Sequence, residues 1–187
     1  MTASVNGIGM NILRNNPYRL LGVYSNSPTK ERLANHNRMK AFLKVGKSVS
    51  FPLDVPQYLS SINRTEASAA DAEAKLTLPK DQILHAQFWF IKTTPLDEVA
   101  FNHLFAGEID KAEEIWQKRE CLSALQNRIV CALIRNRYDS AIKCAEVLYG
   151  NTQYLNQFVS TIIGTGGNFD VSNLSLIHIS EPTRLRC

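Results

Sequence analysis

Apolar residues recur along this chain at intervals of three and four, and long runs that alternate apolar with polar residues are missing. This spacing is typical of amphipathic helices and predicts an all-α protein. Prolines and glycines interrupt the pattern between the periodic segments. We expect helices over residues 17–21, 28–45, 63–78, 80–91, 95–106, 109–118, 121–135, 139–148 and 152–163.

Residues with known preferences for helix ends set these limits. Asn16 and Pro17 suit the start of the first helix, and Gly22 lets the chain leave it. A helix opening at Asn63 would have Glu66 at the third position of a capping box. We expect residues 1–14 to be a flexible N-terminus.

The second half of the chain contains a weak internal repeat. The segment "GEIDKAEEIW" from Gly107 aligns with "NRYDSAIKCA" from Asn136, at an offset of 29 residues. Paired helices at such a period predict a stack of helical hairpins over residues 93–168. This part resembles tetratricopeptide repeats, although the period is shorter than their usual 34 residues.

The first half, residues 15–92, resembles a J-domain. "NPYRLLGV" matches the first helix of that family, "SPTKERLANHNRMKAFLK" its basic second helix, and "AEAKLTLPKDQILHAQFWF" its later helices. In place of the family's His-Pro-Asp tripeptide the chain has "SFPLDVP", in which Phe51 replaces the histidine and Leu53 separates Pro52 from Asp54. In the family, that tripeptide triggers ATP hydrolysis by the seventy-kilodalton heat-shock chaperone. The resemblance therefore implies docking on that chaperone without this trigger.

A cluster of positive charge marks the second predicted helix. Such a face would attract an acidic protein and would be sensitive to salt. An ordinary solvated helix face is the alternative interpretation. The candidate docking residues are Lys30, Arg32, Arg38, Lys40, Lys44 and Lys47, with Glu31 among them.

Composition narrows the partners further. The chain has 187 residues and a formal net charge of +4, which does not require a nucleic-acid partner. No aromatic stacking platform accompanies the basic residues, so nucleic-acid binding ranks last. We expect no membrane span and a cytoplasmic location. We expect Cys121, Cys131 and Cys144 to be reduced core residues.

The sequence offers no recognisable enzyme motif, catalytic group, cofactor site or metal site. We expect His85 to lie in the core and His36 at the surface. Glu113 and Glu114 should form surface pairs with Lys111 and Lys118. The glycines of "GTGGNFD", from Gly164, follow a helix rather than a strand and therefore indicate a linker.

Aromatic residues gather where the two halves of the chain meet. They could line a peptide-binding groove, but a packing interface between the halves is favoured because large aromatic side chains usually serve the core. The residues are Phe88, Trp89, Phe90, Phe101, Phe105 and Trp116.

The last residues differ in kind from the rest. "LSLIHISEPTR", from Leu174, resembles the translation of a transposase-type sequencing adapter. We therefore expect residues 174–187 to be a non-native tail and the hairpin array to be truncated.

Together these observations predict a non-enzymatic, chaperone-associated adaptor or co-chaperone-like protein. The basic helix would dock on a partner, and the helical repeats would hold one. The alternative is an interaction scaffold without a chaperone link, in which the J-domain-like unit only caps the repeats.

Overall fold

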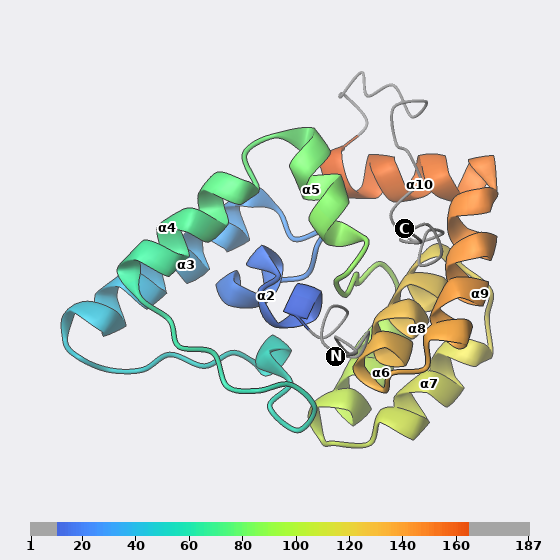
Figure 1. The fold of residues 1–187 in the computed structure, drawn as a ribbon, viewed down its shortest axis with the longest axis horizontal. Coiled ribbons are helices and arrows are strands. Elements are labelled where there is room, and N and C mark those ends of the chain that lie inside the picture. Colours follow the sequence, from blue (N-terminus) through green and yellow to red (C-terminus); the bar gives the residue numbers. More distant parts are fainter. Residues whose placement is uncertain (1–10, 165–187) are drawn as a thin grey trace, which may run out of the picture.

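The computed structural model describes residues 11–164, and this part of the chain is built from helices without strands (Figure 1). The all-α prediction is confirmed. The elements are α2 (Pro17–Leu21), α3 (Thr29–Lys44), the short 3-10 helix η1 (Pro52–Asp54), α4 (Glu66–Lys75), α5 (Pro79–Ala86), α6 (Pro95–Phe105), α7 (Ile109–Gln117), α8 (Leu122–Ile134), α9 (Tyr138–Gly150) and α10 (Thr152–Ile163).

Helix limits agree with the expectation where a cap is strong, as at α2, α6 and α10. The predicted start of α4 at Asn63 is wrong. Thr65 caps this helix instead, because its hydroxyl accepts from the Ser68 amide while the Ser68 hydroxyl accepts from the Thr65 amide. Helix α4 therefore begins at Glu66.

The expectation of a flexible segment before α2 also fails where the structure can test it. Residues 11–14 are helical, and Leu13 is fully buried. A leucine in the core fixes this turn against the helices that follow. Residues 1–10 lie outside the described part of the chain.

Helices α3 and α4 lie side by side and form an arm, seen at the left of Figure 1, with α2 packed against both. Asn35 of α3 ties the arm to α2 by donating to the Leu21 carbonyl at 3.0 Å. On the other side of α2, consecutive helices pack as the pairs α6–α7 and α8–α9. Helix α10 then returns from α9 to α5.

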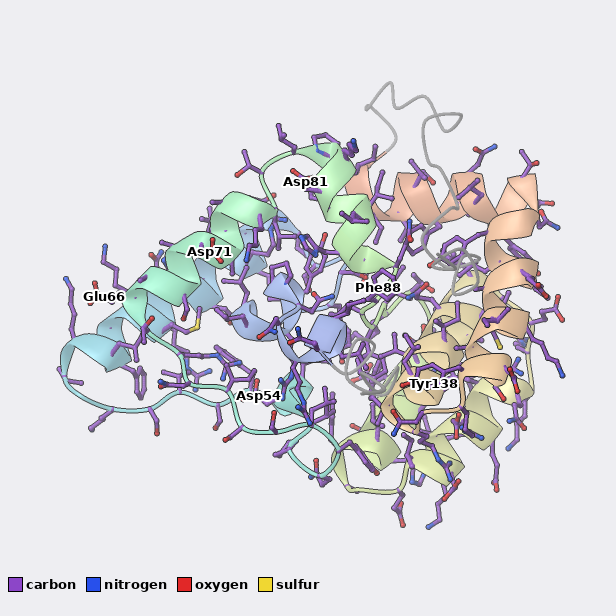
Figure 2. The ribbon with its side chains drawn as sticks, viewed as in Figure 1. Asp54, Glu66, Asp71, Asp81, Phe88 and Tyr138 are labelled. Carbon is purple, nitrogen blue, oxygen red and sulfur yellow. The ribbon has the colours of Figure 1, made fainter. Side chains whose placement is uncertain are left out.

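Residues 87–91, here called the strap, connect the two halves and are not helical, although the apolar pattern predicted helix as far as Ile91. Two buried side chains of α8 bind backbone groups that would otherwise bond within a longer helix. The Gln126 amide donates to the carbonyls of Ala86, Gln87 and Trp89, and Asn127 both donates to and accepts from the Ile91 backbone. Tertiary hydrogen bonds thus end α5 early. Figure 2 labels Phe88 in the strap.

The aromatic cluster is a packing interface, as predicted. The rings of Phe90 and Phe101 meet edge to face with centroids 5.5 Å apart, and Phe101 meets Trp116 at 5.2 Å. Trp89 is fully buried and donates from its indole nitrogen to the Val23 carbonyl at 3.0 Å. These rings fill the core between strap, α6 and α7.

The cysteine thiols lie at different depths, and this predicts different reactivity. Cys131 and Cys144 are buried, as expected, whereas Cys121 is half-buried. Burial raises the pKa of the Cys131 thiol well above its usual value, which suppresses the reactive thiolate.

In the Cys187→Ser variant, Cys121 should react with a thiol-specific disulfide reagent much faster than Cys131. Equal reaction rates for Cys121 and Cys131 in the folded variant would contradict this packing.

Candidate docking surface

Helix α3 is unusually open for a helix of sixteen residues, since only Arg32 and Met39 are buried. Met39 points into the core and is fully covered. Large apolar side chains remain exposed on the same helix and just after it. Leu33, Phe42 and Val45 are 48%, 38% and 67% exposed. Neighbouring apolar and basic groups on an uncovered helix are typical of a docking surface.

Four exposed residues of α3 form what we call the basic stripe, namely Lys30, Leu33, Lys40 and Lys44. At about 100° per residue they fall within roughly 80° of the helix circumference, directed away from Met39. Among the described residues, none of the three lysines has an ion-pair partner. The stripe therefore presents uncompensated positive charge around one apolar side chain. Lys47 is exposed just beyond the helix end.

Arg38 lies on the other flank of α3. Its guanidinium carbon stands 5.8 Å from the centre of the Phe42 ring and 5.7 Å from that of Phe51. These cation–π contacts hold Arg38 over the loop that follows α3. Arg38 is exposed, but it faces a different direction from the basic stripe.

Arg32 departs from the expected surface position. Only 8% of it is exposed, because it faces the core side of α3 and donates to the Thr29 hydroxyl at 3.3 Å. It therefore does not belong to the exposed docking residues. The other five predicted basic residues are all exposed.

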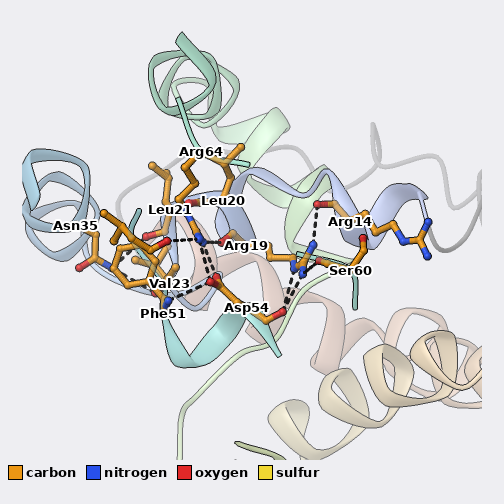
Figure 3. A network of polar contacts seen from close by, with 12 residues as sticks. Arg14, Arg19, Leu20, Leu21, Val23, Asn35, Phe51, Asp54, Ser60 and Arg64 are labelled. Carbon is orange, nitrogen blue, oxygen red and sulfur yellow. Dashed lines mark hydrogen bonds and ion pairs between the residues drawn. The ribbon is translucent and has the colours of Figure 1, made fainter. Parts of the chain in front are cut away.

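The loop that replaces the tripeptide is organised around Asp54 (Figure 3). Arg64 donates to both carboxylate oxygens of Asp54, at 2.9 and 2.5 Å, and the Phe51 amide donates to one of them at 3.1 Å. Phe51 is buried, and its ring lies so close to Gly22 that a Cβ there would meet it at 2.2 Å. Pro52 is exposed. The Asp54 carboxylate is thus committed to holding the loop.

A second arginine, Arg19 of α2, holds the same loop. Arg19 is 1% exposed and donates to the backbone carbonyls of Arg14, Asp54 and Ser60 (Figure 3). Burial lowers the pKa of Arg19 to about 10, and the Asp54 charge opposes that shift. Arg19 remains protonated at neutral pH and joins α2 to two points of the loop.

The histidines do not form a common site. The Nδ1 atom of His36 lies 3.9 Å from a carboxylate oxygen of Glu73 on α4. The Nδ1 atom of His103 lies 2.6 Å from a carboxylate oxygen of Glu108. Burial lowers the pKa of His85, which is half-buried on α5. Within residues 11–164, no group of three or more potential metal ligands comes together.

Glu113 is a further correction to the sequence-based expectation. It is 7% exposed rather than solvated, and it pairs with Arg135 and Arg137 of the connection between α8 and α9. The contacts are long-range in sequence, so the local spacing of charges gave no sign of them. This cluster joins the helix pairs and carries no free group for chemistry.

In comparisons with known proteins, no family model, no curated protein and no solved structure matches this chain. Among the described helices, none combines the length and apolar character needed to cross a bilayer. The segment after Gly164 in "GTGGNFD" and the adapter-like residues 174–187 lie outside the described residues.

Sequence reasoning missed Arg19 and Arg64, which organise the loop around Asp54. Arg64 is 6% exposed and donates to the carbonyls of Arg19, Leu20 and Val49 in addition to its carboxylate partner. Arginines of this kind look like surface residues in a sequence, because their acceptors are backbone carbonyls that any residue supplies.

Proposed function

We propose that the chain is a non-enzymatic adaptor that docks an acidic protein surface through the basic stripe of α3. The observation that carries the proposal is the openness of α3, with uncompensated lysines around the exposed Leu33. The J-domain-like sequence pattern makes the seventy-kilodalton heat-shock chaperone the first partner to test. The packed pairs α6–α7 and α8–α9 supply a second surface, to which we assign binding of a client or adaptor segment.

The loop after α3 supports docking without stimulation of the partner's ATPase. Arg64 and the Phe51 amide occupy three of the about four acceptor positions of the Asp54 carboxylate, so this group is held inside the loop. The Phe51 side chain is buried and carries no polar atom. On this proposal, the loop shapes the arm and the stripe supplies the contact.

The test is a titration of the full chain against the purified chaperone from the same host, following both binding and steady-state ATPase. We expect binding that weakens as salt rises, with no increase in ATPase. Charge reversal in Lys40→Glu/Lys44→Glu should weaken binding by roughly tenfold or more, since rim charges act through electrostatic complementarity.

A matched control reverses the same number of charges elsewhere. Lys80 and Lys92 are exposed, lie outside both proposed surfaces and have no ion-pair partner among the described residues, so Lys80→Glu/Lys92→Glu should leave binding nearly unchanged. Equal weakening by both double variants would reduce the effect to net charge and contradict a specific stripe. Absence of binding at low salt would exclude the chaperone and leave the scaffold interpretation.

A further inference from the structure

The N-terminus of α3 opens into a hollow of about 440 Å³ whose lining contains no carboxylate side chain. Its walls are the 25–28 loop, the first turn of α3, Gln82 of α5 and the last turn of α10. This hollow is separate from the basic stripe, because it faces the core side of the helix.

Two backbone donors at this helix end lack acceptors. Pro28 occupies the N-cap position and has no side chain that can cap the helix. Its carbonyl accepts from the amides of Glu31 and Arg32 at 2.9 and 3.2 Å. Among the described residues, the amides of Thr29 and Lys30 have no acceptor. The positive end of the α3 dipole thus meets the hollow at Thr29, whose amide is free, and the free Lys30 amide follows it on the same turn.

Arg32 gives an independent sign of a missing anion. It lines the hollow and is more than nine-tenths buried, and in the described part of the chain the Thr29 hydroxyl is the one acceptor that its guanidinium meets. No carboxylate lies within ion-pair distance of it there. A buried guanidinium without a counter-charge is costly. The C-terminal end of α10 offers only about half a negative charge, so it balances only part of the Arg32 charge.

We propose that this hollow binds a phosphate group. Thr29 and Arg32 both line the hollow, so the free Thr29 amide, its hydroxyl and the Arg32 guanidinium lie together on the first turn of α3. A helix N-terminus and an arginine are the donors that phosphate oxygens prefer. This site does not depend on the docking proposed above, since Arg32 lies outside the stripe and no partner protein is needed.

The experiment is a titration of the full, ¹⁵N-labelled chain with inorganic phosphate, followed by amide chemical shifts. A parallel titration with sodium chloride at matched ionic strength separates site binding from screening. We expect saturable shifts of the Thr29 and Lys30 amides in the millimolar range with phosphate only. Shifts that follow ionic strength alone in both titrations would overturn the proposal.

Two variants test the two kinds of donor. Arg32→Gln should weaken phosphate binding at least about tenfold, because a charge-assisted donor is lost. Arg38→Gln makes the same substitution at an exposed position of α3 and should leave the affinity unchanged. Equal affinity in the Arg32→Gln variant would contradict the site.

A second pair keeps the proposal testable if Arg32→Gln does not fold. Thr29 is the first residue of α3, where proline is well tolerated, and Pro28 before it has ψ 153°, which suits a following proline. Thr29→Ala removes only the hydroxyl, whereas Thr29→Pro also removes the amide donor. Phosphate should bind more weakly to Thr29→Pro than to Thr29→Ala, and equal binding would show that the amide takes no part.

Discussion

Replacing Asp54 with alanine should lower the free energy of unfolding by about 3 kcal/mol, although Asp54 is only one side chain in a loop. Its partner Arg64 is 6% exposed, and the variant leaves that guanidinium buried without a negative charge. Removing one partner of a buried ion pair typically costs about 3–5 kcal/mol. The backbone carbonyls around Arg64 keep the expected loss at the lower end. Urea unfolding followed by circular dichroism measures it.

Two controls separate this effect from a general loss of charge. Asp71 pairs with Lys75 at 2.7 Å on the surface of α4, with side chains 61% and 50% exposed, so Asp71→Ala should cost less than about 0.5 kcal/mol. In the double variant Asp54→Ala/Arg64→Met neither charge remains, and part of the stability should return. A double variant that loses the sum of both single effects would show that the pair is not coupled.

Replacing Asn127 with alanine is expected to cost about 3 kcal/mol for a different reason. Asn127 is fully buried and holds both backbone groups of Ile91, accepting from its amide at 3.0 Å and donating to its carbonyl at 2.9 Å. Truncation leaves a donor and an acceptor unpaired in the core, each at a cost of about 1–3 kcal/mol. Urea unfolding reports the loss, and hydrogen exchange of the Ile91 amide should accelerate.

Lys92, the residue after Ile91, supplies a matched control. Asn26 holds the Lys92 backbone in the same two-point manner, accepting at 3.0 Å and donating at 2.7 Å, but these groups are exposed. Water replaces the lost partner there, so Asn26→Ala should cost well under 1 kcal/mol. Similar losses in the two variants would contradict the view that burial of the strap sets the cost.

These two sites also show how far the sequence could predict the structure. The helices and most of their limits follow from local signals, such as Thr94 and Pro95 at the start of α6 or Gly22 at the end of α2. The end of α5 does not, because Gln126 and Asn127 compete for its backbone from about 40 residues away in the chain. Local pattern cannot reveal such a competitor.

The candidate surface divides in the same way. The lysines of the stripe were predictable, since their charge and helical spacing are local properties. The burial of Arg32 and the loop-holding roles of Arg19 and Arg64 were not, because they depend on backbone carbonyls and a hollow that only the folded chain brings together. The same limit applies to Glu113, whose arginine partners lie in the later connection between α8 and α9.

The strap has a consequence for the order in which the protein is made. Ile91 is bonded by Asn127, which is synthesised 36 residues later. At about 5–20 residues per second, this gap keeps the newly made strap without its partner for roughly 2–7 s. The Ile91 backbone groups, which are buried in the finished protein, lack this partner during that time. The strap therefore completes its hydrogen bonds only after the ribosome has delivered α8.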